Sequence, residues 1–197
     1  MKTFEYRLYP TKEQSRLLIQ CLIESRLIYN QMLETIKAQY EDTGTFPGKF
    51  DLEAVFKGQG EHVPATTVQM VADRLSKSLK RFLAAKQHTI PGIGFPRFKK
   101  GNQWHSIQLR QYGKDVYVHE DTKHLIIPKK MGKSLKIKLH RPMEGTPKTV
   151  HLVLRADTHW YALIVCETLQ HTEHLSSLCE HPAIGQEGRG THVLLDR

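Results

Sequence analysis

Apolar residues recur with two different spacings along the chain. Phe4, Tyr6 and Leu8 alternate with polar residues, which predicts a half-buried strand over residues 3–9. Thr11 followed by Gln14 is a capping-box sequence, so a long helix is expected to begin directly after Pro10. The apolar stripe of this helix has spacings of three, four and seven and comprises Leu18, Leu22, Tyr29, Met32, Leu33, Ile36 and Tyr40.

A second amphipathic helix is predicted after Pro64, with a short helix possible over residues 49–57. Its apolar stripe comprises Val68, Val71, Ala72, Leu75, Leu79, Phe82 and Leu83, and its opposite face carries Arg74, Lys77, Lys80 and Arg81. The two long helices could also be interpreted as a helix-turn-helix motif. Because the gap between them is about twenty residues, it is too long for the tight turn of that motif.

After the loop at residues 91–96 the apolar spacing changes to two. Strands are predicted at 104–111, 115–119, 123–127, 135–140, 148–155 and 159–167, with turn residues between them. Short strands at this spacing indicate an antiparallel barrel or sandwich, and strand 3–9 is expected to join it. The predicted fold class is therefore α+β, with the helices inserted in an antiparallel β-barrel.

The charge of the chain is concentrated in one stretch. The formal net charge is +9, and residues 97–141 alone hold twelve basic and three acidic residues, which is also a net +9. Such a concentration on a folded segment is the electrostatic footprint of a polyanion binder. Cys21, Cys166 and Cys179 are too scattered for a disulfide framework, and no apolar run predicts a signal peptide or membrane span. We therefore expect a cytoplasmic location.

Residues 94–100 (GFPRFKK) interleave two aromatic residues with three cations. We expect Arg97, Lys99 and Lys100 to contact nucleic acid on one side of the segment. Phe95 and Phe98 are expected to face the core together and to hold the crossover between helices and barrel. In the alternative interpretation, the two rings are platforms on which bases stack.

A second basic feature lies in the strand region, where period 2 aligns Lys136 and Lys138 as a ridge opposite Leu135, Ile137 and Leu139. A solvated edge strand would look similar. The number of cations favours nucleic acid, and the predicted contact residues are Arg7, Arg74, Lys77, Arg81, Arg97, Lys99, Lys100, Lys129, Lys130, Lys133, Lys136, Lys138 and Arg141.

Candidate chemistry is sparse elsewhere. His171, His174, Cys179 and His181 are of types that bind zinc, but their spacing matches no zinc module, so no metal site is predicted. Neither a nucleophile elbow nor a phosphate-binding or dinucleotide-binding glycine loop is present. The sequence therefore favours binding over catalysis.

Six stretches, in order and spacing, resemble the TnpB/OrfB family of insertion-sequence proteins, which is related to the RNA-guided nucleases of type V CRISPR systems. They are residues 6–11 (YRLYPT) with Gln14, 25–30 (SRLIYN), 79–82 (LKRF), 94–99 (GFPRFK), 125–132 (LIIPKKMG) and 160–165 (WYALIV). Together they span about residues 3–168.

The resemblance implies a wedge-type or OB-like β-barrel of residues 1–10 and 95–168 and a helical recognition insertion of residues 11–94. Structured guide RNA and double-stranded target DNA are the implied partners, with no membrane. The matched cations are Arg7, Arg97, Lys99, Lys129 and Lys130. A bacterial or archaeal, nucleoid-associated protein is implied.

The resemblance weakens in residues 169–197, which we interpret as a linker and the truncated start of a RuvC-like domain. Residues 183–188 (AIGQEG) stand where the family has its first nuclease strand, and only Glu187 could replace the first catalytic acid. We therefore expect no cleavage and no cofactor, since magnesium and structural zinc belong to the family's nuclease domain. The alternatives are one part of a split RNA-guided endonuclease, with a separate nuclease chain, and a decayed transposon reading frame.

Overall fold

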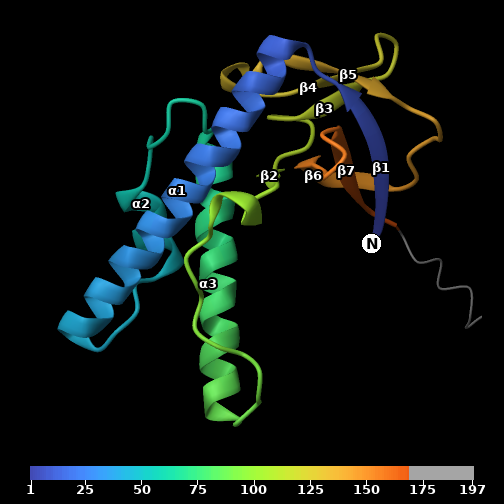
Figure 1. Ribbon diagram of the computed structural model, residues 1–197. Helices are drawn as coiled ribbons and strands as arrows, with labels where there is room; N and C mark the ends of the chain where they lie inside the picture. Colours follow the sequence, from blue (N-terminus) through green and yellow to red (C-terminus); the bar gives the residue numbers. More distant parts are fainter. Residues whose placement is uncertain (169–197) are drawn as a thin grey trace, which may run out of the picture.

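The computed structural model describes residues 1–168, in which helices and a curled sheet pack against each other (Figure 1). The helices are α1 (Lys12–Thr43), α2 (Lys49–Val55) and α3 (Ala65–Gln87). The strands are β1 (Lys2–Tyr9), β2 (Ser106–Leu109), β3 (Tyr117–His119), β4 (His124–Ile126), β5 (Ser134–Lys138), β6 (Thr146–Leu154) and β7 (Trp160–Glu167). Every predicted strand and helix is thereby confirmed, with shifts at the ends.

The capping box predicted for α1 is confirmed. The backbone N–H of Gln14 donates to Thr11 Oγ1 at 3.2 Å, and Gln14 Oε1 accepts from the backbone N–H of Thr11 at 2.9 Å. At the other end, Gly44 takes a left-handed conformation (φ 67°) and its N–H donates to the carbonyl of Tyr40 at 2.9 Å. Both ends of the helix are therefore set by local sequence.

The apolar stripes of both long helices are buried except at their C-terminal ends. Tyr40 of α1 is 45% exposed and Leu83 of α3 is 43% exposed, so the prediction was wrong for these two residues. The sheet lies at one end of the helix pair, and the C-terminal end of α3 projects away from it (Figure 1). The last turns of the two helices therefore have less protein to pack against.

The seven strands form one antiparallel sheet in the order β2-β6-β7-β1-β5-β4-β3. β1 lies at its centre, with Arg7 opposite Lys138 of β5 and Tyr161 of β7. In the described part of the chain β2 and β3 are the two edges, so the sheet is a curled half-barrel. The predicted α+β fold with a barrel-like antiparallel sheet is confirmed, and β1 does join it.

Polar contacts fix the start of α1 on the sheet. Gln14 Nε2 donates to the carbonyl of Ser134 at 2.6 Å, and Trp160 Nε1 donates to Ser15 Oγ at 3.3 Å. The buried side chains of the helices and of the sheet form one continuous cluster. The helices thus have a defined position relative to the strands.

Candidate nucleic-acid interface

One face of α3 and the chain segment that follows it enclose a polar groove of about 360 Å³. We call it the α3 groove; it is lined by Tyr29, Arg74, Ser78, Arg81, Gly92, Ile93, Gly94, Pro96, Arg97 and Lys99. Positions 74, 78 and 81 share one side of α3 because they are spaced by four and three residues. Four of the predicted contact residues, Arg74, Arg81, Arg97 and Lys99, therefore meet around one groove.

Asn30 of α1 holds the far wall of the groove through the backbone of Lys99. Its Oδ1 accepts from the Lys99 N–H at 2.8 Å, and its Nδ2 donates to the Lys99 carbonyl at 3.1 Å. Arg26 Nη1 donates to the same carbonyl at 3.2 Å. Arg26 and Asn30 belong to the family-like stretch 25–30, but the sequence does not predict this clamp, because Asn30 and Lys99 are 69 residues apart.

One aromatic residue, Tyr29, lines the groove, and its ring packs against that of the buried Trp104. The rings of Tyr29 and Trp104 lie 5.2 Å apart, and the guanidinium of Arg74 lies 4.7 Å from the centroid of Trp104. This cation–π contact holds Arg74 at the groove, and no carboxylate of residues 1–168 forms an ion pair with it. Burial raises the pKa of Tyr29, and the nearby charge of Arg74 opposes that rise. Tyr29 therefore stays a neutral phenol at physiological pH.

The predicted arrangement of the two aromatic residues is half right. Phe95 is half-buried and packs against Phe82 (5.4 Å, edge-on) and Phe46 (6.1 Å). Phe98 is 47% exposed and faces Lys37, whose Nζ lies 4.6 Å from its ring. The prediction that both rings face the core was wrong because they are three residues apart, and an extended chain directs such residues to opposite sides.

Two other predicted residues lie near the groove without lining it. Lys77 forms an ion pair with Asp73 at 2.7 Å. Burial alone would raise the pKa of Asp73, but hydrogen bonds and charge from Lys77 and Lys49 outweigh it and lower that pKa. Lys100 is exposed, and its backbone N–H donates to Gln103 Oε1 at 3.1 Å. Lys77 therefore has a protein partner for its charge.

The structure confirms that Lys136 and Lys138 lie on one face of β5, as the sequence predicts. Lys136 and Lys138 are exposed, whereas Leu135 and Ile137 between them are buried. Arg7 pairs with Lys138 in the register of β1 and β5, and so shares the face of the ridge. Arg7 Nε is buried without a hydrogen-bond partner among the described residues, and its guanidinium lies 5.1 Å from the ring of Tyr9.

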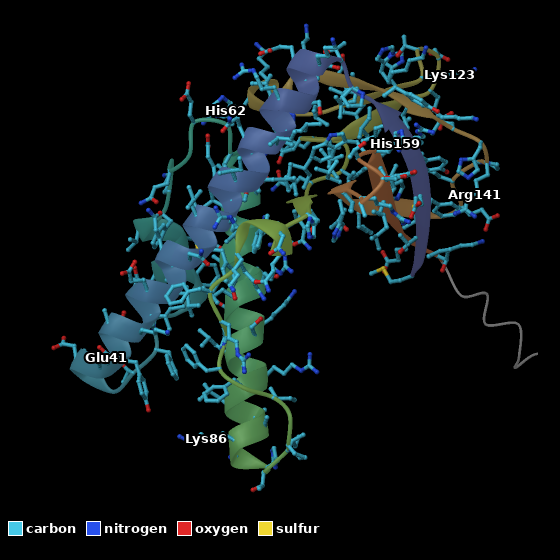
Figure 2. All side chains as sticks on the ribbon, viewed as in Figure 1. Glu41, His62, Lys86, Lys123, Arg141 and His159 are labelled. Atoms are coloured by element: carbon cyan, nitrogen blue, oxygen red, sulfur yellow. The ribbon has the colours of Figure 1, made fainter. Side chains whose placement is uncertain are left out.

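The remaining predicted cations lie elsewhere on the sheet. Lys129 and Lys130 belong to a short 3-10 helix (Lys129–Met131), with Lys133 just after it, and Lys130 Nζ donates to the carbonyl of Gly60 at 3.3 Å. Arg141 is exposed, and its guanidinium lies 5.2 Å from the ring of the buried Phe4. Figure 2 shows Arg141 and Lys123 at the outer end of the sheet and Lys86 at the far end of α3. The basic stretch is therefore spread over several surfaces.

Some predictions fall outside the described residues. These concern His171, His174, Cys179, His181 and Glu187, together with the assignment of residues 169–197 as a linker and truncated domain. Within residues 1–168, no three His, Cys, Asp or Glu side chains form a group that could hold a metal ion. None of the helices described is both long and apolar enough to cross a membrane.

The start of the chain matches a known protein family. Residues 1–45 match the family model HTH_OrfB_IS605, described as a helix-turn-helix domain. In the structure these residues hold β1 and α1, so the matched region is a strand followed by one long helix. No curated protein matches the chain.

Proposed function

Taking residues 1–45 as an N-terminal domain of the TnpB/OrfB insertion-sequence family, we propose that this chain binds nucleic acid through the α3 groove. Such a domain indicates a transposon-associated, DNA-binding protein. The observation that carries the proposal is the convergence of Arg74, Arg81, Arg97 and Lys99 on one groove from two separate segments.

The chemistry of the groove suits a phosphate backbone. Arginine presents a planar fork of donors that matches phosphate oxygens, and three of the four cations are arginine. None of the described residues that line the groove is acidic, so the four charges are not neutralised there. Clustered cations in a concave site attract polyanions and release the counterions condensed on them.

We further propose that the ligands are a structured guide RNA and double-stranded target DNA. The resemblance of residues 3–168 to the TnpB/OrfB family supports this assignment. In systems of that kind base pairing reads the sequence, while protein cations hold the backbone. The role of the groove is then to position phosphates, and its lining of arginine, lysine and glycine requires no particular base sequence.

Fluorescence anisotropy with labelled structured RNA and with duplex DNA tests the proposal. Four phosphate contacts predict a salt slope of about −3.6 on duplex DNA, so affinity should fall roughly a hundredfold between 50 and 200 mM salt. Changing Arg81, Arg97 and Lys99 to Gln should remove up to three contacts and reduce the slope by about 2.7.

The matched control removes the same charge from three exposed lysines outside the groove, Lys12, Lys57 and Lys114. It should leave the salt slope close to that of the unchanged protein. A flat salt dependence of the unchanged protein would contradict nucleic-acid binding. Equal effects of the two triple variants would contradict the assignment of the groove.

A further inference from the structure

A second concave surface lies on the solvent face of the sheet, next to α3. This hollow of about 470 Å³, which we call the sheet hollow, has a floor of strand residues, Thr3, Ser106, His151, Val153, Leu163 and Val165, and a rim of Arg74, Gln103 and His105. The floor residues come from β1, β2, β6 and β7 and alternate with buried residues of the core. The hollow thus combines an apolar patch of Val153, Leu163 and Val165 with polar side chains beside it.

Arg74 connects the two concave surfaces, because it lines both the α3 groove and the sheet hollow. Its guanidinium is held over Trp104, so its position at this junction is fixed. A nucleic-acid strand whose phosphates reach Arg74 in the α3 groove is therefore close enough to present a base to the sheet hollow. Its bases are the part of the ligand that can reach the floor.

The polar side chains that line the sheet hollow include hydrogen-bond donors and acceptors. His151 Nδ1 lies 3.3 Å from the amide Nε2 of Gln108, and since that amide nitrogen can only donate, Nδ1 accepts and Nε2 carries the proton. Burial and the charge of Arg74 lower the pKa of His151, which keeps the imidazole neutral. Gln103 and His105 are exposed and can each donate and accept.

A nucleobase has the matching chemistry, with flat apolar faces and polar edges that donate and accept. We propose that the sheet hollow binds one unpaired nucleobase of the strand whose backbone lies in the α3 groove. This inference rests on the proposed function. A paired base would keep its edges inside the duplex, so the base must be single-stranded, bulged or flipped out of its stack.

The experiment uses two oligonucleotides that differ at one central unpaired position, which is either adenine or an abasic site. Both are made as RNA and as DNA, so that the arms distinguish the two sources of the base. The phosphates are identical, so the ratio of the two affinities measures the base alone. We expect the full chain to prefer adenine about tenfold in at least one arm, which corresponds to about 1.4 kcal/mol.

The variant Leu163→Gln places a polar side chain in the apolar part of the floor. It should bring the ratio of the adenine and abasic affinities close to one without changing the salt slope. The matched control Leu163→Met keeps an apolar side chain and should keep the ratio. Because Leu163 is half-buried, a second variant tests the exposed rim. His105→Ala should lower the ratio, and the His105 side chain is exposed and makes no hydrogen bond to the described residues, so its removal should leave the fold unchanged.

The outcomes separate this inference from the proposed function. Equal affinities for the adenine and abasic oligonucleotides, with salt-dependent binding intact, would overturn base binding by the sheet hollow. Phosphate binding by the α3 groove would be unaffected by that result. The triple variant of Arg81, Arg97 and Lys99 should bind both oligonucleotides more weakly but keep the ratio of the two affinities. A Leu163→Gln variant that retains the preference for adenine would also overturn the inference, and salt-independent binding would remove its premise.

Discussion

The clamp between Asn30 and the backbone of Lys99 holds one wall of the α3 groove against α1. Replacing Asn30 with Ala removes two hydrogen bonds, of 2.8 and 3.1 Å, from a half-buried side chain. Each is worth about 0.5–1.5 kcal/mol in the free energy of unfolding. The greater helix propensity of Ala offsets about 0.5 kcal/mol of this loss. We therefore expect a net destabilisation of about 0.5–2.5 kcal/mol.

The same change should weaken binding although Asn30 lies outside the groove lining. Without Asn30 only the hydrogen bond from Arg26 still holds the Lys99 carbonyl, so Arg97 and Lys99 are less firmly held opposite Arg74 and Arg81. Binding must then bear the cost of ordering them. If both contacts are lost, the salt slope on duplex DNA should fall by about 1.8. The remaining slope should come from the two arginines of α3.

Urea denaturation gives the stability change, and anisotropy titrations between 50 and 200 mM salt give the slope. The control is Gln31→Ala, an exposed neighbour on the same helix. Should Asn30→Ala unfold at the same urea concentration as this control and keep the full salt slope, the clamp would have no part in shaping the groove. A loss of stability with both affinity and salt slope unchanged would contradict a role of the clamp in binding.

Three further predictions concern packing and protonation. Phe95→Ala should lower the free energy of unfolding by about 1–3 kcal/mol in urea denaturation, less than for a fully buried ring, whereas Phe98→Ala should cost under about 1 kcal/mol; equal losses would refute the two environments. Burial and the charge of Arg74 lower the pKa of His151, so the stability that neutral His151 contributes is present above about pH 6.5 and is lost as the pH falls. The free energy of unfolding of His151→Gln should therefore decrease less between pH 7.5 and 5.5 than that of the unchanged protein, and the same decrease in both would count against this. Burial raises the pKa of Cys21 to about 12, so peptide mapping should find this thiol unalkylated in the folded protein at pH 8.5 and alkylated in urea; labelling of the folded protein would show that the site opens.

The sequence by itself determined the elements of this fold because each is specified by neighbours in the chain. The capping box of Thr11 and Gln14 sets the start of α1, and the alternation of Leu135, Lys136, Ile137 and Lys138 sets the two faces of β5. Periods of 3.6 and 2 are properties of local backbone geometry, so they can be counted without knowledge of distant contacts. The α+β class followed from the same counts.

Which cations share a surface was decided only by the tertiary structure. In the chain, residues 97–141 form one basic stretch, but strand register places Lys138 beside Arg7 while the crossover brings Arg97 and Lys99 to Arg74 and Arg81. The clamp joins residues 69 positions apart, and the sheet hollow combines side chains from β1, β6, β7 and α3. Such neighbours depend on how elements pack, because side-chain contacts between distant segments leave no period in the sequence.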